Sequence, residues 1–192
     1  MGDNNTFVGI QSGFSNTTGI NNSFIGSFTG HANTTGSNNS FLGTSAGFSN
    51  VNGAGNSFVG IYSGYKNTSG NYNSYLGYQT GYNNTAGSYN VLLGYRSGYK
   101  NTASFNTFIG YNAGYSNISA NNNVFLGYYA GYLNNAGNNV FIGTLSGYSN
   151  TSGSSNVFVG YASGRLNQTG SSNLFLGTSA GYYNNDGYNN IF

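Results

Sequence analysis

The chain has 192 residues, of which 33 are glycine and only six are charged, four basic and two acidic. Because it has no cysteine, disulfide scaffolds and thiolate metal sites are excluded, and a net charge of +2 with 17% aromatic residues excludes disorder driven by charge. Four scattered cations cannot neutralise a track of phosphates, so we expect no nucleic-acid partner.

A short unit repeats along the chain, so that residues 1–192 are interpreted as a single repeat array. Each unit contains a glycine that follows two apolar residues, here called the anchor glycine, and the anchors are spaced by 17 residues, with two spacings of 16. A second glycine follows four residues after the anchor, and a third follows after ten, with Ser104 and Ala120 in its place in two units. A truncated twelfth unit at 190–192 predicts that the array was cut from a longer one. The anchors are Gly9, Gly26, Gly43, Gly60, Gly77, Gly94, Gly110, Gly127, Gly143, Gly160 and Gly177.

Each unit offers two extended stretches, such as 22–26 and 27–31, followed by a turn rich in glycine and asparagine at 33–38. A unit of this length is too short for helical repeats, which need about 33 residues. The pattern therefore predicts an all-β parallel β-solenoid of eleven coils, in which equivalent residues stack about 4.8 Å apart. The positions expected to form structural ladders include Asn22, Phe24, Ile25, Gly26, Gly30, Asn33, Asn106, Phe108, Ile109, Gly110, Gly114 and Asn117.

Stacked copies explain the residue types. A charged side chain at a repeated position would face its own copy, and like charges at strand spacing are destabilising. An asparagine amide both donates and accepts, so that copies in adjacent coils can bond to one another. We therefore predict a structural role for the asparagine four residues before the anchor and for the one seven residues after it; ligand binding is the alternative.

The apolar pair before each anchor predicts an oligomer. Neighbours such as Phe24 and Ile25 point to opposite faces of a strand, so one series fills the interior and the other forms an outward stripe. Such a stripe is larger than soluble monomers usually expose. We predict a homo-oligomer, a trimer, with a small residue three after the anchor allowing close approach between copies, as at Ala46, Ser63, Ala113 and Ala130.

The segments at 106–117 and 151–156 resemble the Gly-Asn-Thr repeats of bacterial surface and phage tail-fibre proteins. The unit is also similar to the head repeats of trimeric autotransporter adhesins. The resemblance covers the whole chain and implies a left-handed parallel β-roll. It also implies a trimer that presents a binding surface at a distance from its membrane or tail anchor.

Catalytic groups do not converge in the expected fold. Asp3 and Asp186 are the only carboxylates and lie ten coils apart, about 48 Å along the rod, so they cannot form an acid/base pair. His31 stands where most units have tyrosine or phenylalanine, and a lone histidine makes neither a triad nor a metal site. We expect no enzymatic activity, no metal and no cofactor.

Tyrosines supply the candidate binding surface. One series follows the anchor directly and another follows the second glycine; either could contact sugars or a host protein, or could stack on its own copies. The candidate surface consists of Tyr78, Tyr95, Tyr111, Tyr128 and Tyr161.

The sequence thus predicts a structural or adhesive segment of an extracellular fibre, on a bacterial surface or a virion tail. Its expected partners are copies of itself and a host-surface glycan or protein, and no part of it is expected to enter a membrane. A self-assembling filament subunit and an ice-binding solenoid are the alternatives. The threonine row for ice binding, eight residues after the anchor, is broken in several units, as at Val51 and Ile118.

Overall fold

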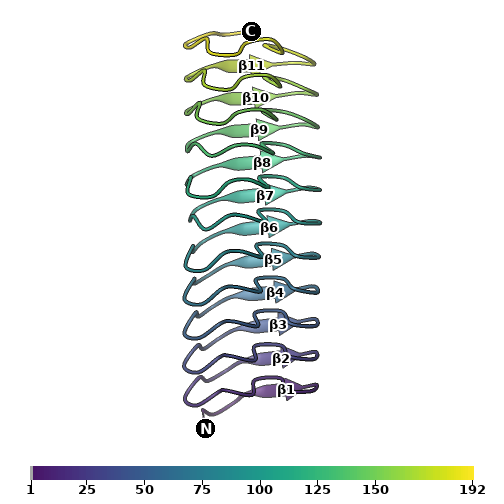
Figure 1. Ribbon diagram of the computed structural model, residues 1–192, viewed down its shortest axis with the longest axis vertical. Coiled ribbons are helices and arrows are strands. Elements are labelled where there is room, and N and C mark those ends of the chain that lie inside the picture. Colours follow the sequence, from purple (N-terminus) through teal and green to yellow (C-terminus); the bar gives the residue numbers. More distant parts are fainter. Residues whose placement is uncertain (1) are drawn as a thin grey trace.

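The computed structural model describes residues 2–192, which form a stack of coils rising in chain order along a rod (Figure 1). Each coil contributes one strand of three residues, and the eleven strands form a single parallel sheet in the order β1 to β11. The predicted all-β parallel β-solenoid with about 17 residues per coil is confirmed. The strands are β1 (Thr6–Val8), β2 (Ser23–Ile25), β3 (Ser40–Leu42), β4 (Ser57–Val59), β5 (Ser74–Leu76), β6 (Val91–Leu93), β7 (Thr107–Ile109), β8 (Val124–Leu126), β9 (Val140–Ile142), β10 (Val157–Val159) and β11 (Leu174–Leu176).

The strands pair so that each residue lies beside its equivalent in the next coil. Phe24 pairs with Phe41, and Ile25 pairs with Leu42. Phe24 is fully buried whereas Ile25 is 41% exposed, because successive side chains of a strand point to opposite faces. The sheet therefore has one face inside the coil and one face on the surface.

The second predicted strand is absent. Residues 27–31 adopt turn conformations, since Phe28 and Gly30 have φ values of 58° and 56°, in the left-handed region that strands do not use. Hydrogen bonds between coils nevertheless continue here. The Phe28 N–H donates to the Ile10 carbonyl of the preceding coil at 2.8 Å, and the Gly30 N–H donates to the Ala46 carbonyl of the following coil at 2.9 Å. On this side, backbone hydrogen bonds link adjacent coils as they do in a sheet, although the residues do not have the backbone angles of strands.

Aromatic rings from the middle of each strand stack along the interior. The ring centroids of Phe24 and Phe41 lie 4.8 Å apart, and those of Phe41 and Phe58 lie 4.7 Å apart. The second glycine of each coil packs under this row: a Cβ on Gly30 would lie 2.5 Å from the Phe24 ring. The second glycine is therefore required by packing as well as by its φ angle.

The small residues three after the anchor lie inside the coil. Ala46, Ser63, Ala113 and Ala130 are completely buried. The expectation that they allow close approach between copies is wrong, because they face the aromatic row of their own chain. Their small size leaves room for those rings.

The aromatic row changes composition at β5 and β6. Tyr75 replaces phenylalanine, and its hydroxyl accepts a hydrogen bond of 2.9 Å from the Asn84 Nδ2. Leu92 follows in the next coil, where a smaller side chain offsets the added volume of the hydroxyl. Burial raises the pKa of the Tyr75 phenol well above its usual range, so this side chain stays neutral.

In the two 16-residue units, the residue that takes the place of the third glycine is not the one ten residues after the anchor. The Asn101 Nδ2 donates to the Ala103 carbonyl and the Asn134 Nδ2 donates to the Ala136 carbonyl, whereas in 17-residue coils the partner is the glycine three residues on, as in Asn33 to Gly36. Ala103, and not Ser104, thus takes the place of the third glycine in its coil. The residue that these coils lack falls in the turn just after the asparagine.

We predict that Gly110→Ala destabilises the rod more than Gly177→Ala. Both glycines have positive φ, 140° and 127°, so both substitutions introduce backbone strain. Only at Gly110 would the added Cβ collide with the carbonyl of the next anchor, Gly127; Gly177 has nothing within 4 Å. The collision should add about 1–3 kcal/mol to the loss of unfolding free energy, measured by denaturant titration. Equal losses in the two variants would show that stacking is not what requires glycine at the anchor.

Candidate functional site: the ladders and the aromatic surface

The two asparagines that recur in every coil hydrogen-bond to one shared carbonyl. The Asn22 Nδ2 donates to the Gly36 carbonyl at 2.8 Å, and the Asn33 Nδ2 donates to the same carbonyl at 3.0 Å. Each also bonds to its copy: the Asn39 N–H donates to the Asn22 Oδ1, and the Asn33 Nδ2 donates to the Asn16 Oδ1. The amides fasten each coil across its interior and to its neighbours.

The same arrangement recurs around β7. The Asn106 N–H donates to the Asn90 Oδ1 at 3.0 Å. The Asn117 Nδ2 donates to the Asn101 Oδ1 at 2.7 Å and to the Ala120 carbonyl at 2.8 Å. Asn106 and Asn117 are buried, as are Phe108 and Gly114. These geometries support the structural interpretation of the asparagines over ligand binding.

The outer face of the sheet carries a narrow aliphatic row, formed by the residue before each anchor. Ile25 and Leu126 are exposed members, whereas Ile109 is half-buried. The whole outer face of the sheet, three residues of strand by ten coil spacings, covers about 10 Å by 48 Å, or roughly 500 Å². The aliphatic row is only part of it, because the first residue of the strand is serine or threonine in β1 to β5 and in β7. A typical monomer exposes a largest apolar patch of about 300–600 Å². The row is therefore of ordinary size, and its area alone does not require a partner.

The residue after each anchor forms a second exposed row, here called the outer tyrosine row. Successive ring centroids of Tyr78, Tyr95, Tyr111 and Tyr128 are 5.4, 4.9 and 5.4 Å apart. Tyr161 lies beyond Thr144 and is 56% exposed. The ring faces of the first four are used in stacking, so their edges and hydroxyls are what they offer to a ligand.

The residue after each second glycine forms a longer row, here called the edge aromatic row. It runs through nine coils with ring centroids 5.0–5.3 Å apart, and only its first member is exposed while the others are half-buried. Arg165 then takes the place of the ring. The row consists of Phe14, His31, Phe48, Tyr65, Tyr82, Tyr99, Tyr115, Tyr132 and Tyr148.

Two tyrosines that the sequence repeat does not reveal connect these rows. Tyr62 lies edge-on to Tyr65 and to Tyr78, with ring centroids 5.5 and 6.4 Å away. Tyr129 contacts Tyr128 and Tyr132 at 4.5 and 5.0 Å. Both occupy the position two after the anchor, which varies from unit to unit and therefore gives no repeat signal.

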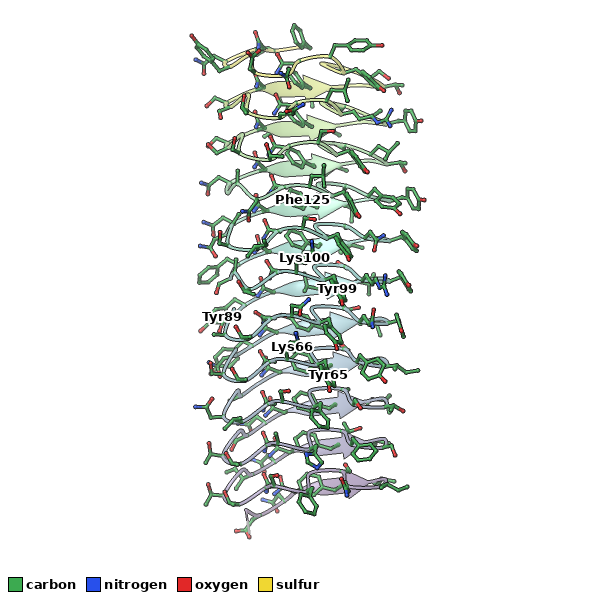
Figure 2. The ribbon with its side chains drawn as sticks, in the orientation of Figure 1. Tyr65, Lys66, Tyr89, Tyr99, Lys100 and Phe125 are labelled. Atoms are coloured by element: carbon green, nitrogen blue, oxygen red, sulfur yellow. The ribbon has the colours of Figure 1, made fainter. Side chains whose placement is uncertain are left out.

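A short third stack lies on the opposite edge of the coil. Tyr72, Tyr89 and Phe105 are more than half exposed, and their successive ring centroids are 5.2 and 5.3 Å apart. Figure 2 shows Tyr89 on one edge, away from Tyr65 and Tyr99. This stack gives little repeat signal in the sequence because it extends over only three units.

The cations lie against tyrosine rings. The Lys66 Nζ is 5.6 Å from the centre of the Tyr82 ring, and the Lys100 Nζ is 5.5 Å from that of Tyr115. Lys66 and Lys100 are exposed, whereas Arg96 and Arg165 are half-buried. Contacts of this kind contribute about 0.5–1 kcal/mol at exposed sites.

A comparison of the chain with protein families, curated proteins and solved structures finds no match.

Within residues 2–192, no three potential metal ligands gather, and no helix is long and apolar enough to span a bilayer. Asp3 precedes β1 and Asp186 follows β11, so the two carboxylates lie at opposite ends of the rod (Figure 1). His31 is stacked between Phe14 and Phe48.

The threonine row considered for ice binding uses its hydroxyls within the rod. The Thr17 Oγ1 donates to the Thr34 carbonyl at 2.9 Å, and the Thr68 Oγ1 donates to the Thr85 carbonyl at 2.8 Å. Thr102 and Thr151 donate in the same way to the coil that follows. These hydroxyl hydrogens are therefore directed along the rod and away from any flat surface lattice.

We predict that Asn117→Asp destabilises the rod by about 2–5 kcal/mol at neutral pH, because a carboxylate cannot donate to the Asn101 Oδ1 or to the Ala120 carbonyl. Burial raises the pKa of the new carboxyl, and the protonated form can donate once. Part of the loss should therefore be recovered below the unfolded-state pKa, and this gain should fade as pH rises through the folded-state pKa.

Asn135→Asp is the matched control in a denaturant titration at several pH values. The Asn135 Oδ1 accepts hydrogen bonds from the Ile118 and Ser119 N–H groups, and a carboxylate accepts them equally well. Similar losses for the two variants would contradict a donor role for the Asn117 amide.

We predict that the rod loses stability above about pH 10. Burial, and secondarily the neighbouring tyrosines, raises the pKa of Tyr82 and of Tyr132 above the usual 10.0. A phenol with a raised folded-state pKa stabilises the fold below its unfolded-state pKa and ceases to do so as pH rises through the folded value. The melting temperature should be level up to that range and fall beyond it. Tyr82→Phe with Tyr132→Phe should reduce the fall, and an unchanged profile would exclude these phenols as its source.

Proposed function

We propose that this chain is a structural and adhesive segment of an extracellular fibre, on a bacterial surface or a virion tail. The observation that carries the proposal is the unbroken in-register pairing of β1 to β11, by which each added unit lengthens the rod by one strand spacing, about 4.8 Å. The resemblance to Gly-Asn-Thr repeats of adhesins and tail fibres supports the same function. A chain in which every unit adds to the length is suited to holding a binding surface at a distance from its anchor.

Adhesion is supported by what the rod exposes. The outer tyrosine row and its connecting residues present phenol edges and hydroxyls over successive coils, and tyrosine contributes contact area and a polar group with little loss of side-chain freedom. A host-surface glycan or protein is the proposed partner of Tyr78, Tyr95, Tyr111, Tyr128 and Tyr161.

A homotrimer of left-handed β-rolls is the proposed assembly, on the basis of the resemblance and of the outer aliphatic row. The whole outer face of the sheet, which includes that row, supplies roughly 500 Å² per copy, below the roughly 800 Å² per partner of a standard interface. We therefore expect the contacts between copies to extend from the sheet onto the neighbouring turns. Sedimentation equilibrium should give three times the 20.1 kDa of the chain; a species of 20.1 kDa would contradict the trimer.

We predict that the length of the rod follows the number of units. Deletion of residues 39–72 removes two whole units. It joins Asn38 to Asn73, the equivalent of Asn39, and so preserves the register of all remaining strands. The maximum dimension from small-angle X-ray scattering should fall by about 10 Å, with the cross-section unchanged. Deletion of residues 39–65, which is not a whole number of units, is the control and should disrupt the fold. A smaller cross-section with an unchanged maximum dimension would contradict the fibre proposal.

A further inference from the structure

Three of the four cations border three successive rings of the edge aromatic row. Lys66 lies over Tyr82, Arg96 over Tyr99 and Lys100 over Tyr115. Figure 2 shows Lys66 and Lys100 beside Tyr65 and Tyr99 on the same side of the rod. The only carboxylates of the chain, Asp3 and Asp186, belong to its first and last coils. The middle of the rod therefore has a local positive charge with no acidic side chain to offset it.

Arg96 joins this charge to the outer tyrosine row. Its guanidinium lies 5.2 Å from the centre of the Tyr95 ring and 5.5 Å from that of Tyr99. The Arg96 Nε donates to the Gln79 Oε1 at 2.7 Å, which holds the group between the two rows. The cations beside the edge aromatic row and the phenol hydroxyls of the outer tyrosine row are thus linked through Arg96 over neighbouring coils. Together they are here called the cationic tyrosine patch: Lys66, Tyr78, Tyr95, Arg96, Lys100 and Tyr111.

We propose that the cationic tyrosine patch binds an acidic polysaccharide, a chain of hydroxylated sugars that carries carboxylates. This proposal rests on the adhesive function proposed above and names its ligand class. The cations pair with the carboxylates, and the phenol hydroxyls of Tyr78, Tyr95 and Tyr111 bond to sugar hydroxyls. Lys66 and Lys100 are separated by two coil spacings, about 10 Å, so an extended chain running along the rod meets both.

The geometry favours a polysaccharide over single-stranded nucleic acid, the other flexible polyanion. Binding of unpaired bases depends on free aromatic faces on which they stack. The faces of Tyr95 and Tyr111 are covered by one another, with ring planes 8° apart, so edges and hydroxyls remain for recognition. Hydroxyl groups suit a sugar chain, which is rich in donors and acceptors.

The test measures binding of the full chain to an alginate oligosaccharide, a polymer of uronic acids, by isothermal titration calorimetry. Dextran, a neutral glucan, and oligothymidylate serve as comparison probes. The proposal expects alginate to bind with an affinity that falls as salt is added, and expects neither comparison probe to bind as well. Binding of oligothymidylate as tightly as alginate would overturn it, as would absence of alginate binding.

Variants locate the site. Lys66→Gln with Lys100→Gln should weaken alginate binding by about 1.5- to 5-fold for each cation removed. Arg165→Gln is the matched control, because it removes one positive charge from the row outside the patch and should leave the affinity unchanged. Tyr95→Phe keeps the stacked ring, and so the fold, but removes a hydroxyl; a two- to tenfold loss is expected. Equal losses per charge removed, in Arg165→Gln and in the double variant, would show that net charge alone binds the polymer.

The outcomes separate this proposal from the fibre function. If alginate does not bind while the deletion of two units still shortens the rod, the ligand class is wrong and the fibre function stands. If the deletion fails to shorten the rod, the fibre function is wrong whatever alginate does.

Discussion

Almost every residue of this rod lies one strand spacing from its own equivalent, and the other features of the structure depend on that constraint. A side chain is acceptable at a repeated position only if it can stand next to itself. Phe24 does so by stacking on Phe41, and Asn33 does so by donating to Asn16 and leaving its own oxygen for Asn50. A charged side chain has no such arrangement, since like charges at this distance repel. The very low charge of the sequence follows directly.

The same constraint determines what could be predicted. A period of 17 residues, two neighbouring apolar residues and regular asparagines were enough to predict the parallel solenoid, and the strand period of two predicted that Phe24 and Ile25 face opposite sides of the sheet. Which of the two lies inside came from the structure. The turn conformation at 27–31 was not predictable, because it depends on a left-handed φ at Phe28, a residue type that rarely adopts it. The repeat reports that positions are equivalent; it does not report the backbone angles that they share.

The candidate site was predictable along the rod but not across it. Rows such as Tyr78 to Tyr128 follow from equal spacing, whereas contacts between rows depend on which turn positions lie side by side around one coil. Tyr62 and Arg96 connect the two rows from the position two residues after the anchor, which varies from unit to unit, so no periodicity marks them. The small residue at Ala46 was misplaced for a related reason: spacing alone does not say whether a turn side chain points into the coil.

Departures from the repeat then become the places where a uniform rod can acquire specificity, and the lysines show how far the stacking constraint allows this. Lys66 and Lys100 occupy the same position in two coils, with Asn83 between them. Adjacent lysines would be about 4.8 Å apart, well inside the roughly 8 Å screening length at physiological salt. The intervening asparagine doubles the separation to about 10 Å, beyond that length, so the two charges repel each other only weakly. Alternation of a cation with a neutral amide is thus a pattern that lets a solenoid carry charge along one face while keeping its coils in register.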